Sequence, residues 1–185
     1  MADLKVLGIC GSLRKASLNM AALRACGELL PPGMTLQIAS IDGLPMFNQD
    51  VLDAGMPDPV RRIREQIAAA DGLLISSPEY NFSVPAPLKN LIDWASRAPN
   101  QVFQDKPIAI FSTAPGPVGG ARMQYDLRKI LVQLWGHVLP RPEVFIANAA
   151  PKFQDGRLVD ETSRKFLSEL LAGFREWILR MSHKH

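Results

Sequence analysis

Five short apolar runs alternate with amphipathic, helix-like segments along the chain, and this alternation restricts the fold more than any other feature. The expected strands are residues 5–10, 34–40, 72–77 and 106–112, with a fifth inside 138–146. The expected helices are residues 18–30, 59–70, 85–97, 120–135 and 161–181. Strands that are separated by helices form βαβ units, so we predict an α/β protein with a parallel sheet covered on both faces.

The handedness of βαβ crossovers leaves few possible orders for such a sheet. The order 2-1-3-4-5 of a flavodoxin-like three-layer sandwich is the natural solution for a five-stranded parallel sheet. Its ligand crevice lies at the carboxyl ends of the first and third strands. The length suits a single core and no linker or repeat divides the sequence, so we expect one domain over residues 1–185.

Three segments depart from the plain alternation of strands and helices. Pro140 and Pro142 interrupt the fifth strand, and an edge position would tolerate them. Residues 41–58 hold glycines, prolines and aspartates without periodicity, which predicts a long surface loop. In the last helix an i, i+3, i+4 stripe predicts the buried face, formed by Phe166, Leu170, Phe174, Trp177, Ile178 and Met181.

Composition and charge argue against several classes of protein. Hydrophobic residues make up 47% and charged residues 21%, as in a folded globular protein. The net charge of +3 is mildly basic, but lysines and arginines are too dispersed for a nucleic-acid interface. No apolar run approaches the roughly 18 residues of a membrane span, and no signal peptide is apparent. We therefore expect no nucleic-acid or membrane partner.

The cysteines and histidines predict neither a disulfide nor a metal site. Cys10 and Cys26 are far apart and form no CxxC, which favours buried thiols in a reduced cytoplasm. His137, His183 and His185 do not have ligand spacing with cysteines or carboxylates.

The stretch GSLRKASLN, residues 11–19, lies between the first strand and the first helix. The start of a helix offers unpaired N–H groups that suit a phosphate, and Ser17 is a plausible N-cap. Arg14 can donate a charge-assisted fork to phosphate oxygens. The other interpretation is a capped turn with a solvated arginine. The stretch is neither GxxxxGK[ST] nor GxGxxG, which disfavours a P-loop NTPase and an ordinary dinucleotide site.

Two further loops emerge at the same edge of the predicted sheet. SPEYNFSVPAP, residues 77–87, is stiffened by prolines and suits a flat heterocycle that Tyr80 could flank, or it is a surface turn. STAPGPVGGAR, residues 112–122, contains glycines that let the backbone approach a ligand. A phosphate on the first loop and a planar ring between the other two describe FMN.

At these residues the chain resembles the NADPH-dependent FMN reductase family, and most of all its bacterial quinone, chromate and azo-dye reductases. The similar motifs are GSLRKASLN, SPEYNFSVPAPLKNLIDWASR and GGARMQYDLRKIL. The resemblance implies phosphate contacts from Ser12, Arg14, Ser17, Leu18 and Asn19. It implies ring contacts from Pro78, Glu79, Tyr80, Asn81 and Ser83, with Thr113 and Gly116 near the flavin. Relatives often carry consecutive serines where Ala114 and Pro115 follow Thr113.

The resemblance implies hydride transfer from NADH or NADPH to FMN, then reduction of a quinone, chromate, azo dye, ferric chelate or free flavin. Both substrates would use one open flavin face in turn, which predicts ping-pong kinetics, and no side chain need act as a nucleophile. Arg97 is the candidate for binding the nicotinamide nucleotide or an anionic acceptor. Its alternative role is to neutralise the end of a helix.

The resemblance also implies a homodimer or homotetramer. The helix at 120–135 agrees, because its apolar band is broader than one sheet face requires: Leu127, Ile130, Leu131, Val132, Leu134 and Trp135.

Two other functions remain open on the sequence. A flavodoxin-type electron carrier would bind FMN without consuming NAD(P)H, although such carriers are usually strongly acidic. A regulatory module would bind phosphate without flavin.

Overall fold

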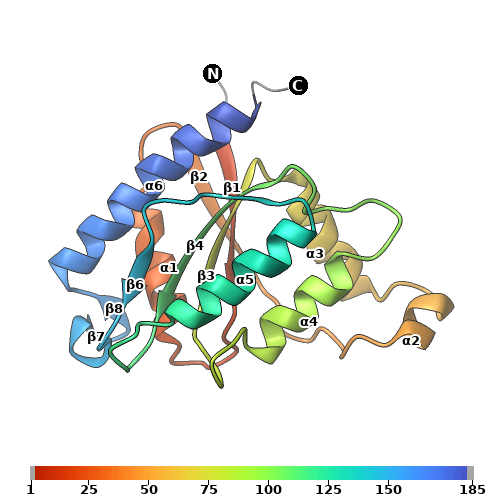
Figure 1. Ribbon diagram of the computed structural model, residues 1–185, viewed down its shortest axis with the longest axis horizontal. Helices are drawn as coiled ribbons and strands as arrows, with labels where there is room; N and C mark the ends of the chain where they lie inside the picture. The colour runs from red at the N-terminus through yellow and green to blue at the C-terminus, as the bar shows by residue number, and fades with distance from the viewer. Residues whose placement is uncertain (1–2, 183–185) are drawn as a thin grey trace.

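The computed structural model describes residues 3–182, and it confirms the parallel sheet flanked by helices (Figure 1). The strands are β1 Leu4–Cys10, β2 Met34–Ala39, β3 Gly72–Ser77, β4 Pro107–Thr113, β5 His137–Val138, β6 Val144–Ile146, β7 Phe153–Gln154 and β8 Arg157–Leu158. The helices are α1 Leu18–Glu28, α2 Gln49–Ala54, α3 Asp58–Ala69, α4 Ala86–Ala95, α5 Ala121–Gln133 and α6 Glu161–Ser182, with a 3₁₀ turn at Ala150–Lys152. His183 and His185 lie outside the described residues.

The sheet has the predicted order, β2-β1-β3-β4-β5, with every neighbouring pair parallel. The fifth strand position differs from the expectation, because two short strands share it. β5 pairs with the start of β4 and β6 pairs with its end. Pro140 and Pro142 lie between them, where a residue without an N–H group cannot continue the ladder.

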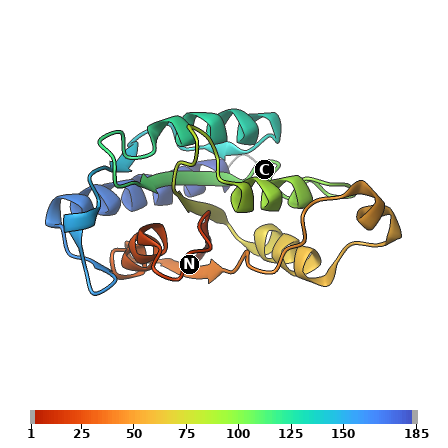
Figure 2. The same cartoon turned by 90° about the horizontal axis from the view of Figure 1, so that it is seen from below.

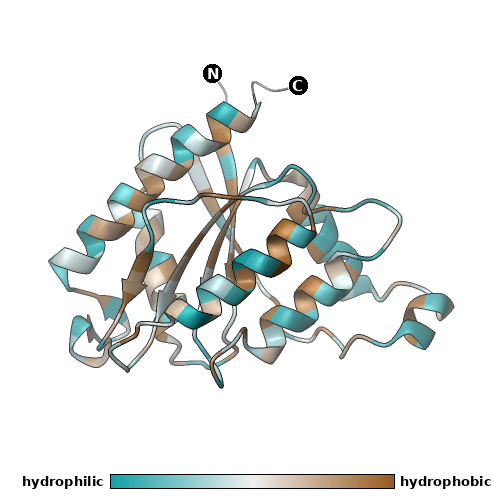
Figure 3. Cartoon of the chain, in the orientation of Figure 1, coloured by the Kyte–Doolittle hydropathy of each residue, from teal (hydrophilic) through white to brown (hydrophobic). Residues whose placement is uncertain are grey.

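Two hydrophobic clusters hold the three layers together. One lies between the sheet and α1 with α6, and it includes Phe111 and Phe174. The other lies between the sheet and α3, α4 and α5. Figure 2 looks along the sheet and shows helices on both of its faces. Figure 3 shows apolar and polar residues alternating around these helices, as burial of one helix face requires.

The predicted loop at 41–58 contains the short helix α2, which projects from the side of the molecule (Figures 1 and 2). The side chain of Asn48 accepts a hydrogen bond from the Asp50 N–H and caps this helix. The loop is anchored to α4 at one place. The Asn90 amide accepts from the Phe47 N–H and donates to the Pro45 carbonyl, which the Trp94 indole N–H also reaches at 2.7 Å.

The face of α6 is displaced from the prediction at its first turns. Phe166 is 49% exposed, and the neighbouring Leu167 and Leu171 are buried in its place. Leu170, Phe174, Ile178 and Met181 are buried as predicted, and Trp177 is partly buried with its indole N–H donating to the His137 carbonyl at 2.7 Å. The β7–β8 hairpin before α6 has no counterpart in the prediction, since each of its strands is two residues long.

Candidate functional site

Loop 1, residues 11–17, begins where β1 meets β3. The Gly11 N–H donates to the Ser76 carbonyl at 2.8 Å. A Cβ atom on residue 11 would lie 2.3 Å from the Ser77 hydroxyl oxygen, so only glycine permits this approach. Ser17 caps α1 as predicted, because its hydroxyl accepts a hydrogen bond from the Met20 N–H at 3.2 Å.

Asn19 holds loop 1 against two strands. Its side chain is buried, at 4% exposed. The amide nitrogen donates to the Thr113 carbonyl at 2.8 Å, and the amide oxygen accepts from the Thr113 N–H at 2.9 Å. The Ser76 hydroxyl donates to the Asn19 main-chain carbonyl at 3.0 Å and also lies 3.2 Å from the same amide oxygen. The amide group is thus used within the protein, which leaves the backbone N–H of Asn19 as its group for a ligand.

Loop 2, residues 78–85, turns back on itself at Asn81 and Phe82. Tyr80 and Ser83 exchange both backbone hydrogen bonds, at 3.1 and 3.0 Å. Asn81 has φ 49° and Phe82 has φ 70°, the pattern of a tight type I′ turn. The aromatic ring of Phe82 is exposed, and the guanidinium carbon of Arg122 lies 3.9 Å from its centroid.

Glu79 joins loop 2 to α5. Its carboxylate accepts hydrogen bonds from the N–H groups of Arg122 at 3.0 Å and Met123 at 3.3 Å. It also forms an ion pair with the Arg122 guanidinium at 2.9 Å. A negative charge at the start of a helix satisfies unpaired N–H groups and the positive end of the helix dipole. The side chain of Glu79 is therefore a cap for α5 in addition to its predicted place beside the ring.

Replacing Glu79 with glutamine should lower the free energy of unfolding by about 1 kcal/mol, as the loss of a helix cap does. The neutral amide oxygen of glutamine accepts hydrogen bonds from the two N–H groups more weakly than the charged carboxylate does. The ion pair with Arg122 is also lost. Urea denaturation of the FMN-free protein measures the change. Glu65→Gln is the control, because Glu65 is exposed on α3 and forms no ion pair within residues 3–182. Equal stability of the two variants would contradict the capping role.

Loop 3, residues 114–120, depends on glycine at its end. Gly119 and Gly120 have φ 64° and 88°, and a Cβ on residue 120 would lie 2.9 Å from that of Ser112. The Ser112 hydroxyl donates to the Gly119 carbonyl at 2.6 Å and accepts from the buried Gln124 amide at 2.8 Å. Gly116 faces open space, since no atom lies within 4 Å of a Cβ built on it.

These loops fit the phosphate and ring of FMN. The Thr113 hydroxyl is buried at the end of β4, beside Asn19 of α1, and it has no hydrogen-bond partner among the described residues. Leu18 and Asn19 occupy the first turn of α1, where N–H groups have no carbonyl to reach within the helix. In loop 2 the N–H groups of Asn81 and Phe82 donate to no acceptor within residues 3–182. The edge thus presents unused donors beside an unused hydroxyl.

The structure brings the predicted residues of loops 1, 2 and 3 to one edge of the sheet but places Arg97 elsewhere. α4 starts at this edge and runs away from it over 10 residues, about 15 Å at 1.5 Å per residue. Beyond its end the Arg97 guanidinium donates to the Asp93 carbonyl at 2.9 Å and lies 5.2 Å from the Phe47 ring. The buried Arg64 donates to the carbonyls of Ala95, Arg97 and Asn100 and so holds this turn.

Both cysteines are free and buried. Burial raises the pKa of the Cys10 thiol, and hydrogen bonding to Ser12 and Ser17 opposes that rise only in part. Burial raises the pKa of Cys26 to about 12. A protonated thiol is a poor nucleophile, so neither side chain supplies chemistry here.

No helix within residues 3–182 is long and apolar enough to cross a membrane. No group of three or more histidine, cysteine, aspartate or glutamate side chains in this range could hold a metal ion.

Sequence reasoning missed the residues that brace the loops. Ser76, Gln124 and Arg122 were not predicted, and Glu79 was assigned to the ring alone. Ser76 follows the apolar residues of β3, and a hydroxyl at the end of a buried strand is the signal that could have identified it. Gln124 lies in the mixed segment ARMQYDLRK, which carries no such signal.

Comparison with known proteins agrees with this geometry. Residues 4–151 match the family described as NADPH-dependent FMN reductase. An NAD(P)H-dependent FMN reductase of Pseudomonas aeruginosa is 49% identical over 97% of both chains. A quinone reductase of Escherichia coli K12 is 40% identical over 96% of this chain and 97% of its own. The structure of FerB, a flavoenzyme NAD(P)H:(acceptor) oxidoreductase from Paracoccus denitrificans, is 34% identical, with a TM-score of 0.88 over 96% of this chain and 98% of its own.

The predicted resemblance, fold, enzyme class and cofactors are thereby confirmed. The chain belongs to the NADPH-dependent FMN reductase family, whose members are oxidoreductases that use FMN and a nicotinamide nucleotide.

Proposed function

We propose that this protein is an FMN-dependent NAD(P)H:quinone oxidoreductase. The observation that carries the proposal is the unpartnered Thr113 hydroxyl, buried at the carboxyl edge of the sheet from which loops 1, 2 and 3 emerge. When bound there, FMN supplies two-electron chemistry by taking hydride from NAD(P)H and giving it to an acceptor. Quinone is the acceptor that the E. coli relative's name supports. Chromate, azo dyes, ferric chelates and free flavin are further candidates.

Loop 1 and the first turn of α1 would hold the phosphate. Ser12 supplies a hydroxyl, Arg14 a cation, and Leu18 and Asn19 supply N–H groups at the positive end of the helix. The Ser17 hydroxyl accepts the capping bond from Met20 and lies 3.8 Å from the Cys10 thiol, and when the thiol is the donor its own proton is available to a phosphate oxygen. The N–H groups of Leu18 and Asn19 cost little to reorganise, because the Ser17 cap and the Asn19 amide already fix the start of α1.

Loops 2 and 3 would hold the ring. Pro78 and Glu79 set the start of loop 2, and the type I′ turn presents the N–H groups of Asn81 and Phe82. Tyr80 is exposed and could flank the ring, while Ser83 closes the turn. Thr113 and Gly116 would border the ring from loop 3. Backbone donors near the ring oxygens would stabilise negative charge there.

Arg97 remains a candidate for the nucleotide or an anionic acceptor only if a second protomer brings it near the site. Its position at the far end of α4 supports the alternative role, since its guanidinium neutralises a main-chain carbonyl at the helix end.

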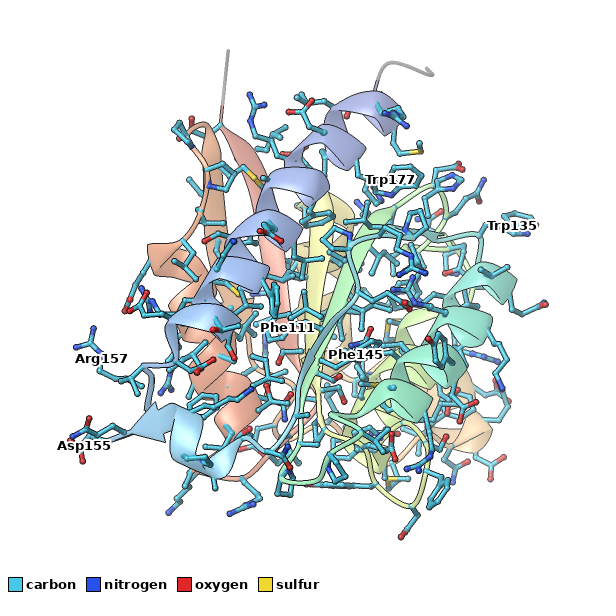
Figure 4. The ribbon with its side chains drawn as sticks, turned by 60° about the vertical axis from the view of Figure 1, so that its left-hand side comes forward. Phe111, Trp135, Phe145, Asp155, Arg157 and Trp177 are labelled. Atoms are coloured by element: carbon cyan, nitrogen blue, oxygen red, sulfur yellow. The ribbon has the colours of Figure 1, made fainter. Side chains whose placement is uncertain are left out.

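Self-association is part of the proposal. Val132 is 65% exposed and Trp135 is 64% exposed at the end of α5, and Figure 4 shows Trp135 pointing away from the body of the protein. Leu127 and Leu131 of the predicted band are buried, whereas Ile130 and Leu134 are partly buried. Large apolar side chains grouped on one helix favour a homodimer or homotetramer. A reduced cytoplasm is the proposed location, in agreement with the two free thiols.

Initial-rate kinetics test the proposed function. We expect the FMN-loaded protein to lose its flavin absorbance when NADPH or NADH is added without oxygen, and to regain it when a quinone is added. Donor and acceptor would use one open face in turn. Double-reciprocal plots of initial rate against NAD(P)H concentration, at several fixed quinone concentrations, should therefore give parallel lines. Intersecting lines would exclude the alternating order.

The same spectra separate the enzyme from the alternative functions. A flavodoxin-type carrier would keep its absorbance when NAD(P)H is added, and a phosphate-binding module would not become yellow with FMN. The net charge of +3 also weighs against a carrier that docks through acidic residues.

A further inference from the structure

Phe82 is the large apolar side chain that loop 2 exposes most, with 67% of its surface accessible. It lies at the tip of the turn, between Asn81 and Ser83. Figure 1 shows loop 2, between β3 and α4, extending beyond the carboxyl ends of the strands. A single exposed apolar side chain is ordinary on a protein surface. Two further features, the backbone conformation of Phe82 and the contact on its ring, set this one apart.

The backbone conformation at Phe82 is unfavourable for a residue of this type. Its φ of 70° lies in the left-handed region, which the second central position of a type I′ turn requires. Glycine is the usual residue there, because a side chain raises the energy of this conformation. A phenyl ring at this position therefore costs stability and gains little burial. Strain of this kind indicates that the ring has a use other than folding.

The ring is held in one orientation instead of being left free. The Arg122 guanidinium carbon lies 3.9 Å from the ring centroid, within the range of a cation–π contact. Arg122 is fixed in turn by Glu79, whose carboxylate pairs with the guanidinium at 2.9 Å and is only 12% exposed. Arg122 covers one face of the ring, so the exposed surface of Phe82 lies on its other face and edges. That surface is pre-organised for stacking.

The charge around the ring indicates the class of ligand. The Glu79 carboxylate neutralises the Arg122 guanidinium, so this pair offers no free positive charge to an anionic acceptor. Tyr80, which is 44% exposed, adds a second aromatic side chain two residues before Phe82. Aromatic side chains gain from offset or edge-to-face stacking on another flat ring and from the apolar area that the contact buries. The ligand that these groups suit is an uncharged, planar aromatic molecule.

We propose that Phe82 is a specificity-determining residue for the acceptor, and that its free ring face stacks on planar quinones and favours bicyclic naphthoquinones over monocyclic benzoquinones. The inference rests on the proposed function, in which a quinone is reduced at the flavin. Loop 2 brings the Phe82 ring beside that site, because the N–H groups of Asn81 and Phe82 are the proposed donors to the flavin ring. A fused second ring gives the quinone more planar area for the contact with Phe82.

Equilibrium binding to the oxidised holoenzyme tests the proposal without turnover. FMN-loaded protein is titrated in a calorimeter with 2,3-dimethyl-1,4-naphthoquinone and with tetramethyl-1,4-benzoquinone, whose ring positions are all substituted so that thiols do not add to them. We expect the naphthoquinone to bind the unaltered protein about 10-fold more tightly, and Phe82→Ala to lower this ratio at least about 3-fold, as the loss of an aromatic pair does. Phe82→Tyr, which keeps the ring, should retain the ratio. Equal affinities for the unaltered protein, or the same ratio in Phe82→Ala, would overturn the proposal.

Steady-state kinetics give the second measurement. The ratio of kcat/KM for the two quinones should fall in Phe82→Ala by the same factor as the binding ratio, mainly through KM. This ratio cancels any change that affects both acceptors alike, such as weaker flavin binding. Phe166→Ala, which removes an exposed ring from α6, is the control and should keep the ratio of the unaltered protein.

Two further results separate this proposal from its alternatives. If size-exclusion chromatography showed that Phe82→Ala dissociates an oligomer while the quinone ratio stays the same, the ring would be a subunit contact and the proposal would fail. If the unaltered holoenzyme oxidised neither NADPH nor NADH, the proposed function would fail, and the calorimetry would still decide whether Phe82 distinguishes the two quinones.

Discussion

The Asn19→Ala protein should lose about 3 kcal/mol of unfolding free energy and bind FMN at least 10-fold more weakly. The substitution removes both partners of the Thr113 main chain, the amide nitrogen at 2.8 Å and the amide oxygen at 2.9 Å. Each buried group left without a partner costs about 1–3 kcal/mol. Loop 1 would also lose its attachment to β4, so the donors for the phosphate would no longer be held in place. Urea denaturation and fluorescence titration with FMN measure the two effects.

Two further variants sharpen this prediction. Asn19→Asp keeps the shape and one acceptor but turns a carboxylate oxygen toward the Thr113 carbonyl, so it should be at least as destabilising as alanine. Gln154→Ala is the control, because it removes an exposed amide from β7. Surface substitutions ordinarily change the free energy of unfolding by less than about 0.5 kcal/mol. A change that small for Asn19→Ala would show that the amide does not hold loop 1 to β4.

The second large effect is expected for Arg14→Ala, which should weaken FMN binding about 10- to 100-fold. Hydrogen bonds to a charged group contribute about 1.5–3 kcal/mol, and the fold-change follows from that range. Riboflavin, which has the ring without the phosphate, should bind the variant within 2-fold of its affinity for the unaltered protein. The comparison of the two flavins isolates the phosphate contact from any general damage to the site.

Arg61→Ala serves as the matched control for Arg14→Ala, since it removes an exposed arginine from α3. It should leave both affinities unchanged and thereby exclude a simple effect of net charge. Parallel loss of FMN and riboflavin affinity in Arg14→Ala would mean that Arg14 supports the ring site through the fold rather than the phosphate through its charge.

Periodicity was sufficient to predict the elements that build the sheet. β3 was predicted to the residue, and the other central strands end within one residue of the prediction, because buried parallel strands are continuous apolar runs bounded by glycine and proline. The split fifth strand and α2 were missed for a different reason. Each is too short for a period to be visible, and both depend on tertiary partners such as β4 and the Asn48 cap.

The position of the site was also predictable, because parallel strands necessarily bring their carboxyl ends to one edge. The contacts that shape it were not. Glu79 lies 43 and 44 residues before the two N–H groups that it caps, and Asn19 lies 94 residues from Thr113. Pairings over such distances leave no periodic trace, and Phe82 in a left-handed turn contradicts the usual preference for glycine there.

One side chain ties each loop around the site to another element: Asn19, just after the first loop, bonds to β4, Glu79 of the second loop caps α5, and Ser112 of β4 bonds to the third loop. Tyr80, Phe82 and Val118 lie between these contacts with exposed side chains, whose replacement has little effect on stability. Their side chains can therefore diverge freely, and one scaffold can be tailored to acceptors of different size and charge without being rebuilt.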